Sequence, residues 1–538
     1  MGRIAPPAVL LLALAAPPAP AQSPLSAIDW LSRSVEEASP PRAQPPATPH
    51  PPPGGDPDAS AGVLPPPLSR GPRALVPEAI TVTPLDAPTV DAVGLLPADR
   101  LGLPRDLWGP APSAELARGM ARLTPDMAPA LQRLTLALLL AELAPPGDAE
   151  GRGALFLARL DRLIAFGALD QALALVEAAG PDQSPALFAR WFDAALLAGD
   201  PAPACAALRA RPELAAEHPL APAARIYCLA RGGEWEAAET LLETPEAGSL
   251  PEAERSALAR FLDPDADHQP APALPTARAE PSALLWHLLD ALGEAPPTAT
   301  LPLAFAHADL GPSAGWKARI EAAERLTRAG ALTPNRLLGL YTERAPAASG
   351  GVWERVRSIQ QIEAALLAQD PERMADILPR AWAHMVEAEL ETAFADIYAE
   401  RLLRLELPPE AAGMAWRAGL LTDAAAEVAP RRAPASTRDA FLAAIATGRL
   451  APDTPRPSGA MPEAIALALT AAETPRSAAR LADSGRGWGL LEALAILQGS
   501  GAEDPRAVAE GLELLRAAGQ DEVARRAALQ ILLLDRRG

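Results

Sequence analysis

Three glycines, each followed five residues later by an alanine, recur at a nearly constant interval in this chain. The pairs are Gly167 with Ala172, Gly199 with Ala204, and Gly233 with Ala238. Glycine reaches the left-handed backbone geometry that ends many helices without a Cβ penalty, and a small alanine lets the next helix approach closely. The glycines at 167, 199 and 233 are 32 and then 34 residues apart, an interval typical of stacked helical hairpins. The spacing therefore predicts an all-α fold, an α-solenoid of antiparallel helical hairpins.

This pattern is typical of tetratricopeptide repeats, and residues 154–244 resemble that family. The resemblance implies that each glycine ends the first helix of a hairpin and that each alanine packs the second helix against it. Weaker matches follow at Gly330, Gly419 and Gly519, and Gly330 lacks the alanine. The proline that closes a repeat in that family is irregular here, so these are degenerate, TPR-like units.

Composition also favours a helical chain with irregular connections. Aromatic residues make up only 4% of the 538 residues, and alanine, leucine, arginine and glutamate dominate. The 62 prolines cluster between the helical runs, where they act as stops. Tryptophans such as Trp286 and Trp416 are expected in hairpin cores, and the run from Leu131 to Leu143 is expected to be a buried helix.

The changes in pattern along the chain predict its organisation. Residues 73–112 are expected to lie along the surface of the helical array, and the closing run 524–538 is expected to cap its end. The predicted segments are 1–21 (signal peptide), 22–38 (short amphipathic segment), 39–72 (Pro-rich disordered tether), 73–112 (extended irregular segment), 113–263 (TPR-like helical repeats), 264–281 (Pro-rich break), 282–430 (helical repeats), 431–462 (loop-rich zone) and 463–538 (C-terminal helices).

The N-terminus has the three parts of a secretory signal peptide. Arg3 supplies a positive charge, residues 8–16 supply a short apolar core, and Ala19-Pro20-Ala21 supplies a cleavage site. The apolar core is too short to span a bilayer. We therefore expect secretion across the inner membrane of a Gram-negative cell to the periplasm, with no membrane insertion after cleavage.

The two cysteines, Cys205 and Cys228, fit an exported protein. The loop 211–222 joins the two helices that carry them, and both cysteines are equidistant from its midpoint. We expect a structural disulfide; two buried thiols or a metal pair are the alternatives, and no histidine pattern beside them supports zinc.

Segment 22–38, which follows the signal peptide, carries an apolar helical face. Leu25, Ile28, Leu31 and Val35 lie on this face, and Trp30 lies off it. We expect a docking segment, either for another protein or for a groove of this chain. The alternative is an N-terminus without a role of its own.

Charge and motifs exclude several classes of function. A net charge of −19 argues against binding of nucleic acid, because phosphate binding requires basic patches. The six histidines show no paired-ligand spacing, and no nucleophile elbow or phosphate-binding loop is present. The sequence predicts no enzyme, no cofactor and no metal site.

These observations favour a non-enzymatic scaffold or adaptor that binds protein or peptide partners in the periplasm. The alternatives are a peptidoglycan hydrolase or its regulator, and a passive structural protein. The chain also resembles uncharacterised exported alphaproteobacterial proteins sometimes labelled "antifreeze glycopeptide polyprotein". That function is not transferred, because antifreeze glycopeptides are Thr-Ala-Ala arrays and this chain contains no such array.

Overall fold

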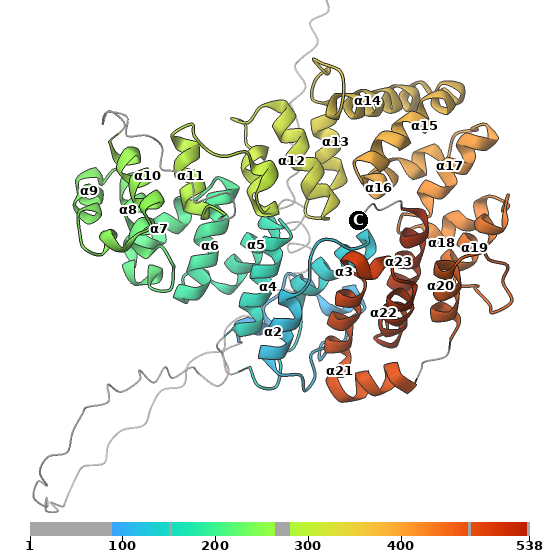
Figure 1. Ribbon diagram of the computed structural model, residues 1–538, viewed down its shortest axis with the longest axis horizontal. Helices are drawn as coiled ribbons and strands as arrows, with labels where there is room; N and C mark the ends of the chain where they lie inside the picture. The colour runs from blue at the N-terminus through green and yellow to red at the C-terminus, as the bar shows by residue number, and fades with distance from the viewer. Residues whose placement is uncertain (1–88, 150–152, 264–279, 472–474, 535–538) are drawn as a thin grey trace, which may run out of the picture. The chain divides into compact units, whose positions relative to one another are not determined.

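Most of the chain forms short α-helices joined by tight turns (Figure 1). The computed structural model describes residues 89–149, 153–263, 280–471 and 475–534, which belong to one unit, Thr83–Gly538. Within these ranges the strands are two residues long: β1 (Leu96–Pro97) pairs in parallel with β2 (Ala141–Glu142). The described residues are all-α, which confirms that part of the predicted fold class. The signal peptide, the segment 22–38 and the tether 39–72 lie outside the described residues.

The first elements surround these strands. They are η1 (Val90–Ala92), η2 (Ala98–Leu101), α2 (Ser113–Ala121) and α3 (Pro129–Leu140).

A run of helices follows up to the Pro-rich break. Its elements are α4 (Ala154–Ala165), α5 (Leu169–Ala179), α6 (Pro185–Ala198), α7 (Ala202–Ala210), η3 (Pro212–Ala215), α8 (Ala221–Arg231), α9 (Trp235–Leu242), η4 (Ala247–Ser249) and α10 (Glu252–Leu262).

The second run begins after the break. Its elements are α11 (Ala283–Ala291), η5 (Thr298–Thr300), η6 (Leu303–Leu310), α12 (Trp316–Arg328), α13 (Pro334–Thr342), α14 (Val352–Ala368), α15 (Pro371–Glu387), α16 (Glu391–Leu402), α17 (Pro409–Gly419), α18 (Ala425–Val428) and η7 (Ala429–Arg431).

The last elements end the described chain. They are α19 (Thr437–Ala446), α20 (Ala460–Thr470), α21 (Pro475–Ile496), η8 (Gly499–Ala502), α22 (Pro505–Ala517) and α23 (Asp521–Leu533).

Local sequence explains where many helices begin. Ser184, Ser282 and Ser436 precede helices, and their hydroxyls accept hydrogen bonds from backbone N–H groups three residues later. Prolines also start helices, because the first turn needs no N–H donor from that position. The helices that begin with proline include those at Pro129, Pro185, Pro334, Pro371, Pro409 and Pro505.

One type of turn ends many of the helices. At Gly167, Gly199 and Gly233 the φ angles are 71°, 85° and 84°. Each glycine N–H bonds to the carbonyl three residues earlier, and the following N–H bonds to the carbonyl five residues earlier, the pattern of a Schellman motif. The same two bonds occur at Gly293, Gly330, Gln369, Glu389, Gly448 and Gly519.

Gly419 is the exception among the weaker sequence matches. It lies at the end of α17 and is absent from the glycines with positive φ. A Cβ there would come within 2.7 Å of the Val428 side chain. The prediction of a repeat turn at Gly419 was therefore wrong, because this glycine serves close helix packing.

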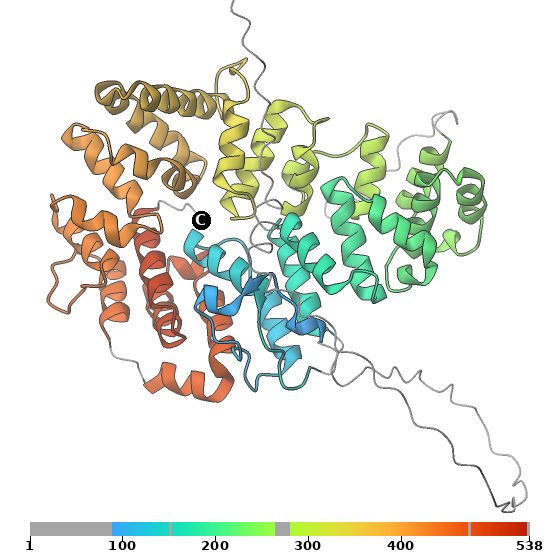
Figure 2. The same cartoon turned by 180° about the vertical axis from the view of Figure 1, so that it is seen from behind.

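The N-terminal and C-terminal helices contact each other. α3 lies beside α23 in both views (Figures 1 and 2), and the backbone N–H of Ala130 donates to Gln530 Oε1 at 2.7 Å. The α2–α3 linker is also tied to Gln498, whose side chain bonds to Thr124 and Arg122. α23, which holds most of the closing run, packs against α3 as well as against α19, α20 and α22.

The segment before α2 is also part of the core. Trp108 and Leu107 are buried, and the N–H of Gly487 donates to Leu107 O at 3.0 Å. A Cβ on Gly487 would meet the Trp108 ring at 2.7 Å, so glycine allows α21 to approach this segment. The prediction that residues 73–112 lie along the surface of the helical array was therefore wrong for residues 89–112, the part of this segment that the structure describes.

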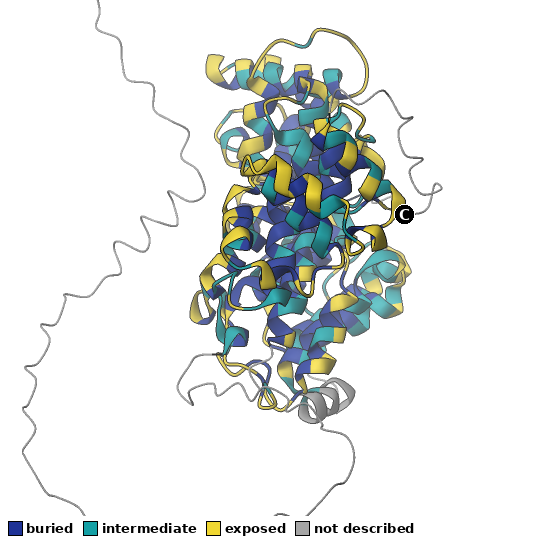
Figure 3. Cartoon of the chain, turned by 90° about the vertical axis from the view of Figure 1, so that its left-hand side faces the viewer, coloured by how far each residue is buried: buried dark blue, intermediate teal, exposed yellow. Residues whose placement is uncertain are grey.

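The zone 431–462 contains a helix that the sequence did not predict. α19 lies inside it, and Phe441, Leu442 and Ile445 of α19 are buried. Prolines on both sides of α19 gave the zone its loop-like composition, but Ser436 caps a stretch long enough for an amphipathic helix. Buried positions face neighbouring helices throughout the described elements, and exposed positions lie on their outer sides (Figure 3).

The three repeat glycines differ in what surrounds them. A Cβ on Gly167 would lie 2.7 Å from Leu326 Cδ2 and 2.8 Å from Leu303 Cγ, whereas nothing lies within 4 Å of one on Gly199. The buried ring of His307 also bonds to Gly167 O, with Nε2 at 2.5 Å. Gly167 thus joins α4 and α5 to η6 and α12.

We expect Gly199→Ala to lower the free energy of unfolding by about 1 kcal/mol, the cost of a left-handed alanine. Gly167→Ala should cost about 2–4 kcal/mol, because overpacking adds to that cost. Urea unfolding followed by circular dichroism measures both. Equal losses of unfolding free energy for the two variants would contradict the close packing of Gly167 against η6 and α12.

Candidate functional site

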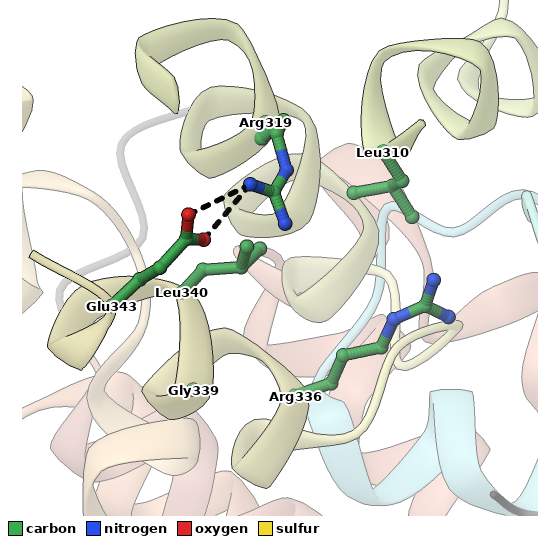
Figure 4. A pocket seen from close by; sticks show the side chains of 6 residues that line it. All are labelled: Leu310, Arg319, Arg336, Gly339, Leu340 and Glu343. Atoms are coloured by element: carbon green, nitrogen blue, oxygen red, sulfur yellow. Dashed lines mark hydrogen bonds and ion pairs between the residues drawn. The ribbon is translucent and has the colours of Figure 1, made fainter. Parts of the chain in front are cut away.

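A polar pocket lies between η6, α12 and α13 and has a volume of about 250 Å³ (Figure 4). We call it the α12–α13 pocket. Its walls combine two arginines, one glutamate, two leucines and a glycine. The lining residues are Leu310, Arg319, Arg336, Gly339, Leu340 and Glu343.

The two arginines of the α12–α13 pocket come from different helices. Arg319 of α12 donates through Nη1 to both carboxylate oxygens of Glu343, at 3.1 and 2.8 Å. Arg336 of α13 lies 3.3 Å from Asp170 of α5 through its own Nη1. Figure 4 shows the two guanidinium groups on opposite sides of the pocket. Hydrogen bonds from Arg344 and Arg319 lower the pKa of Glu343, so this carboxylate is ionised.

A buried ion pair fixes the helices behind the α12–α13 pocket. Glu324 of α12 accepts two hydrogen bonds from Arg355 of α14, at 2.8 and 2.6 Å, and one from the Tyr341 hydroxyl at 2.7 Å. Burial, with the adjacent Glu324 charge, raises the pKa of Tyr341, which stays a neutral donor. The indole N–H of Trp316 donates to Leu340 O. These contacts hold α12, α13 and α14 in one arrangement.

A second, smaller pocket of about 170 Å³ lies between α19, α20, α22 and α23. Arg516 lines it and donates to the carbonyls of Ala468 and Ala471 at the end of α20. The positive charge there offsets the negative end of the helix dipole. The role of Arg516 is therefore structural.

Ser358, His384 and Glu354 contain the residue types of a hydrolytic triad. Ser358 Oγ lies 2.8 Å from His384 Nδ1, and His384 Nε2 lies 3.8 Å from Glu354 Oε2. The serine is buried in the middle of α14, however, and the backbone N–H groups around it are committed to the helix. Such a site offers no donors to a developing oxyanion. The three side chains instead link α14 to α15. In the sequence, the only indication of this cluster was the i, i+4 spacing of Glu354 and Ser358.

A cluster of charges joins α3, α16 and α23. Arg133 of α3 lies 3.3 Å from Asp396 of α16 and 3.4 Å from Asp423, which also pairs with Arg526 of α23. Burial raises the pKa of Asp396 to about 6, although Arg133 acts in the opposite direction. The pKa of this carboxylate therefore lies above the ordinary range of aspartate.

The structure brings only some of the sequence-predicted residues together. Cys205 of α7 and Cys228 of α8 form a disulfide with their Cα atoms 4.9 Å apart, the pairing that the spacing favours. Ala172, Ala204 and Ala238 are buried in three successive second helices, and their glycines end the preceding ones. The residues of the predicted docking segment, Leu25, Ile28, Trp30, Leu31 and Val35, lie outside the described residues.

The sequence did not predict the α12–α13 pocket or the buried Arg159. The pocket depends on two helices and a 3-10 turn meeting in space. For Arg159 a signal existed, since it lies three residues after Phe156 on the buried face of α4. Across the described ranges, no group of three or more His, Cys, Asp or Glu side chains could hold a metal ion. No described helix has the length and apolar character needed to cross a membrane.

Comparison of the chain with family models, with curated proteins and with solved structures found no match.

The disulfide closes a loop of 23 residues between α7 and α8. We expect the double substitution of Cys205 and Cys228 by alanine to lower the free energy of unfolding by about 3 kcal/mol, because the unfolded chain gains entropy. Denaturant unfolding of the oxidised protein and the double variant measures the loss. A reducing agent should lower the free energy of unfolding of the wild type and leave that of the double variant unchanged. A wild type whose free energy of unfolding does not respond to the reducing agent would contradict a structural disulfide.

The raised pKa of Asp396 predicts a pH-dependent stability. A folded-state pKa of about 6, against an ordinary value of 3.8 for this side chain, contributes stability that is full below pH 4 and is lost as the pH rises through 6. Relative to Asp396→Asn, the wild type should therefore lose about 1–2 kcal/mol between pH 4 and pH 7. Denaturant unfolding of both proteins across this range tests it. If the wild type instead gained stability relative to Asp396→Asn as the pH rises, the attraction of Asp396 to Arg133 would outweigh the effect of burial on its pKa.

Proposed function

We propose that this protein is an exported, non-enzymatic helical-repeat scaffold that binds protein or peptide partners in the periplasm. In this proposal the helices form an α-solenoid of TPR-like hairpins. The signal-peptide pattern and the disulfide support export, because disulfides persist in oxidising compartments.

The observation that carries the proposal is the shared turn. In three consecutive helix pairs the first helix ends at Gly167, Gly199 or Gly233 with the same two backbone hydrogen bonds. Each pair contacts the next pair in sequence, as in α5 with α6 and α7 with α8. Stacked hairpins expose a continuous helical surface, and proteins of this kind use such surfaces to hold extended peptides or partner helices.

An exposed aromatic side chain adds to this argument. Trp235 begins α9 directly after the third repeat turn and is 46% exposed. Its ring lies 6.3 Å from the ring of Phe261, which in turn lies 5.8 Å from Tyr227. A tryptophan held against other rings in this way loses little freedom on binding and is a frequent anchor at protein interfaces.

The segment 22–38 is the second part of the proposal. Leu25, Ile28, Leu31 and Val35 would form the apolar face of a docking helix. Segments of this kind bind by laying that face into a groove, with aromatic residues such as Trp30 at its edge.

Affinity purification from periplasm after chemical crosslinking tests the proposal. The full chain should recover specific partners, and Trp235→Ala should reduce their recovery several-fold. Leu367→Ala is a matched control, since Leu367 is also exposed, on the distant α14. Deletion of residues 23–38 tests the docking segment separately. Failure to recover a partner, together with a cleared band in peptidoglycan zymography, would overturn the scaffold in favour of a hydrolase.

A further inference from the structure

Gly339 lies in the middle of α13, where no contact or backbone geometry within the chain requires a glycine. The helix runs from Pro334 to Thr342, and glycine in a helix interior costs about 1 kcal/mol relative to alanine. Its backbone is helical, so the left-handed freedom of glycine is not used. A Cβ at this position would meet no atom within 4 Å. Neither backbone geometry nor packing requires glycine here.

The other glycines inside described α-helices are different. Like Gly485 at the kink in α21, each would place a Cβ within 4 Å of a neighbouring side chain or backbone. These glycines are Gly119, Gly413, Gly419, Gly487, Gly489 and Gly511. Gly339 differs in that the space above it belongs to the α12–α13 pocket. Glycine at such a position allows another molecule to approach the helix backbone closely.

The charges around Gly339 specify what that molecule carries. Arg319 and Arg336 line the pocket, and Arg344 lies beside them on Glu343. Their three positive charges face the two negative charges of Glu343 and Asp170, an excess of one on a chain with a net charge of −19. Arg319 uses Nη1 for Glu343, and the ion pair of Glu324 with Arg355 keeps α12 in place. Planar guanidinium groups match the geometry of carboxylates.

We propose that the α12–α13 pocket binds a carboxylate of a peptide, between Arg319 and Arg336 and against Gly339. The volume of about 250 Å³ accommodates one side chain or one terminal residue. Leu310 and Leu340 contact the apolar part of that residue. This inference rests on the proposed function, since it names the part of a partner that the scaffold recognises.

Three pools of acetylated tetrapeptides test the pocket on the immobilised full chain. The first pool has free C-terminal carboxylates and no acidic side chains. The second is amidated and carries one Asp or Glu, and the third is amidated with Asn or Gln in their place. Mass spectrometry measures the retained peptides. We expect the first or the second pool to be retained about tenfold more than the third, and the preferred pool identifies the source of the carboxylate.

Variants connect this retention to the pocket. Gly339→Ala should raise the unfolding midpoint and reduce retention of the preferred pool to that of the third. Arg336→Gln should also reduce retention of the preferred pool to that of the third pool. Gly413→Ala is the matched control, because Gly413 is also inside a helix, and its Cβ would make only ordinary contacts with Arg432. Gly413→Ala should therefore retain the preferred pool as the wild type does.

Equal retention of all three pools, or undiminished retention by Gly339→Ala, would overturn the carboxylate pocket. If crosslinked partners are still recovered in that case, only the pocket is wrong and the scaffold stands. Selective retention of acidic peptides without any recovered protein partner would instead contradict the scaffold.

Discussion

The buried guanidinium of Arg159 organises the beginning of this structure. It donates to Leu139 O at 2.7 Å and Ala141 O at 3.0 Å, where α3 ends, and to Val93 O at 2.7 Å. Asp91 of the same N-terminal segment accepts the N–H of Phe156 at the start of α4. Burial lowers the pKa of Arg159 to about 10, so it is still charged at neutral pH. Carbonyl groups satisfy this charge, and α3, α4 and the segment before them are fixed together. The contacts of α3 with α16 and α23 depend on that arrangement.

Helix α3 shows why this anchoring matters. Almost every residue of α3 is buried, and such a helix must be covered on all sides. Its partly exposed charge, Arg133, faces Asp396 and Asp423. A net charge of −19 is thus compatible with arginines placed one by one at helix junctions, each beside a carboxylate or a carbonyl. Arg159, Arg355 and Arg516 all act in this way.

The sequence predicted those parts of the fold that local chemistry determines. Gly167, Gly199 and Gly233 could be recognised because glycine is the usual residue for a left-handed helix end. Gln369 and Glu389 adopt the same geometry, with φ of 51° and 55°, and could not be recognised, because residues with a Cβ rarely adopt it. The α12–α13 pocket required knowledge of how η6, α12 and α13 meet. Gly339 was visible in the sequence, but its meaning depends on the empty space above it.

The hydrogen bond between Ala130 and Gln530 joins residues 400 positions apart. Ala128, at the start of α3, provides no side-chain cap of its own, so a residue of α23 supplies the acceptor. A contact of this sequence separation slows folding far more than it lowers stability, because the ends of a long loop must first meet. During synthesis α3 is made hundreds of residues before α23. Its apolar surface therefore stays incompletely covered until α23 has been made, and chains that stop before α23 are the species most exposed to aggregation.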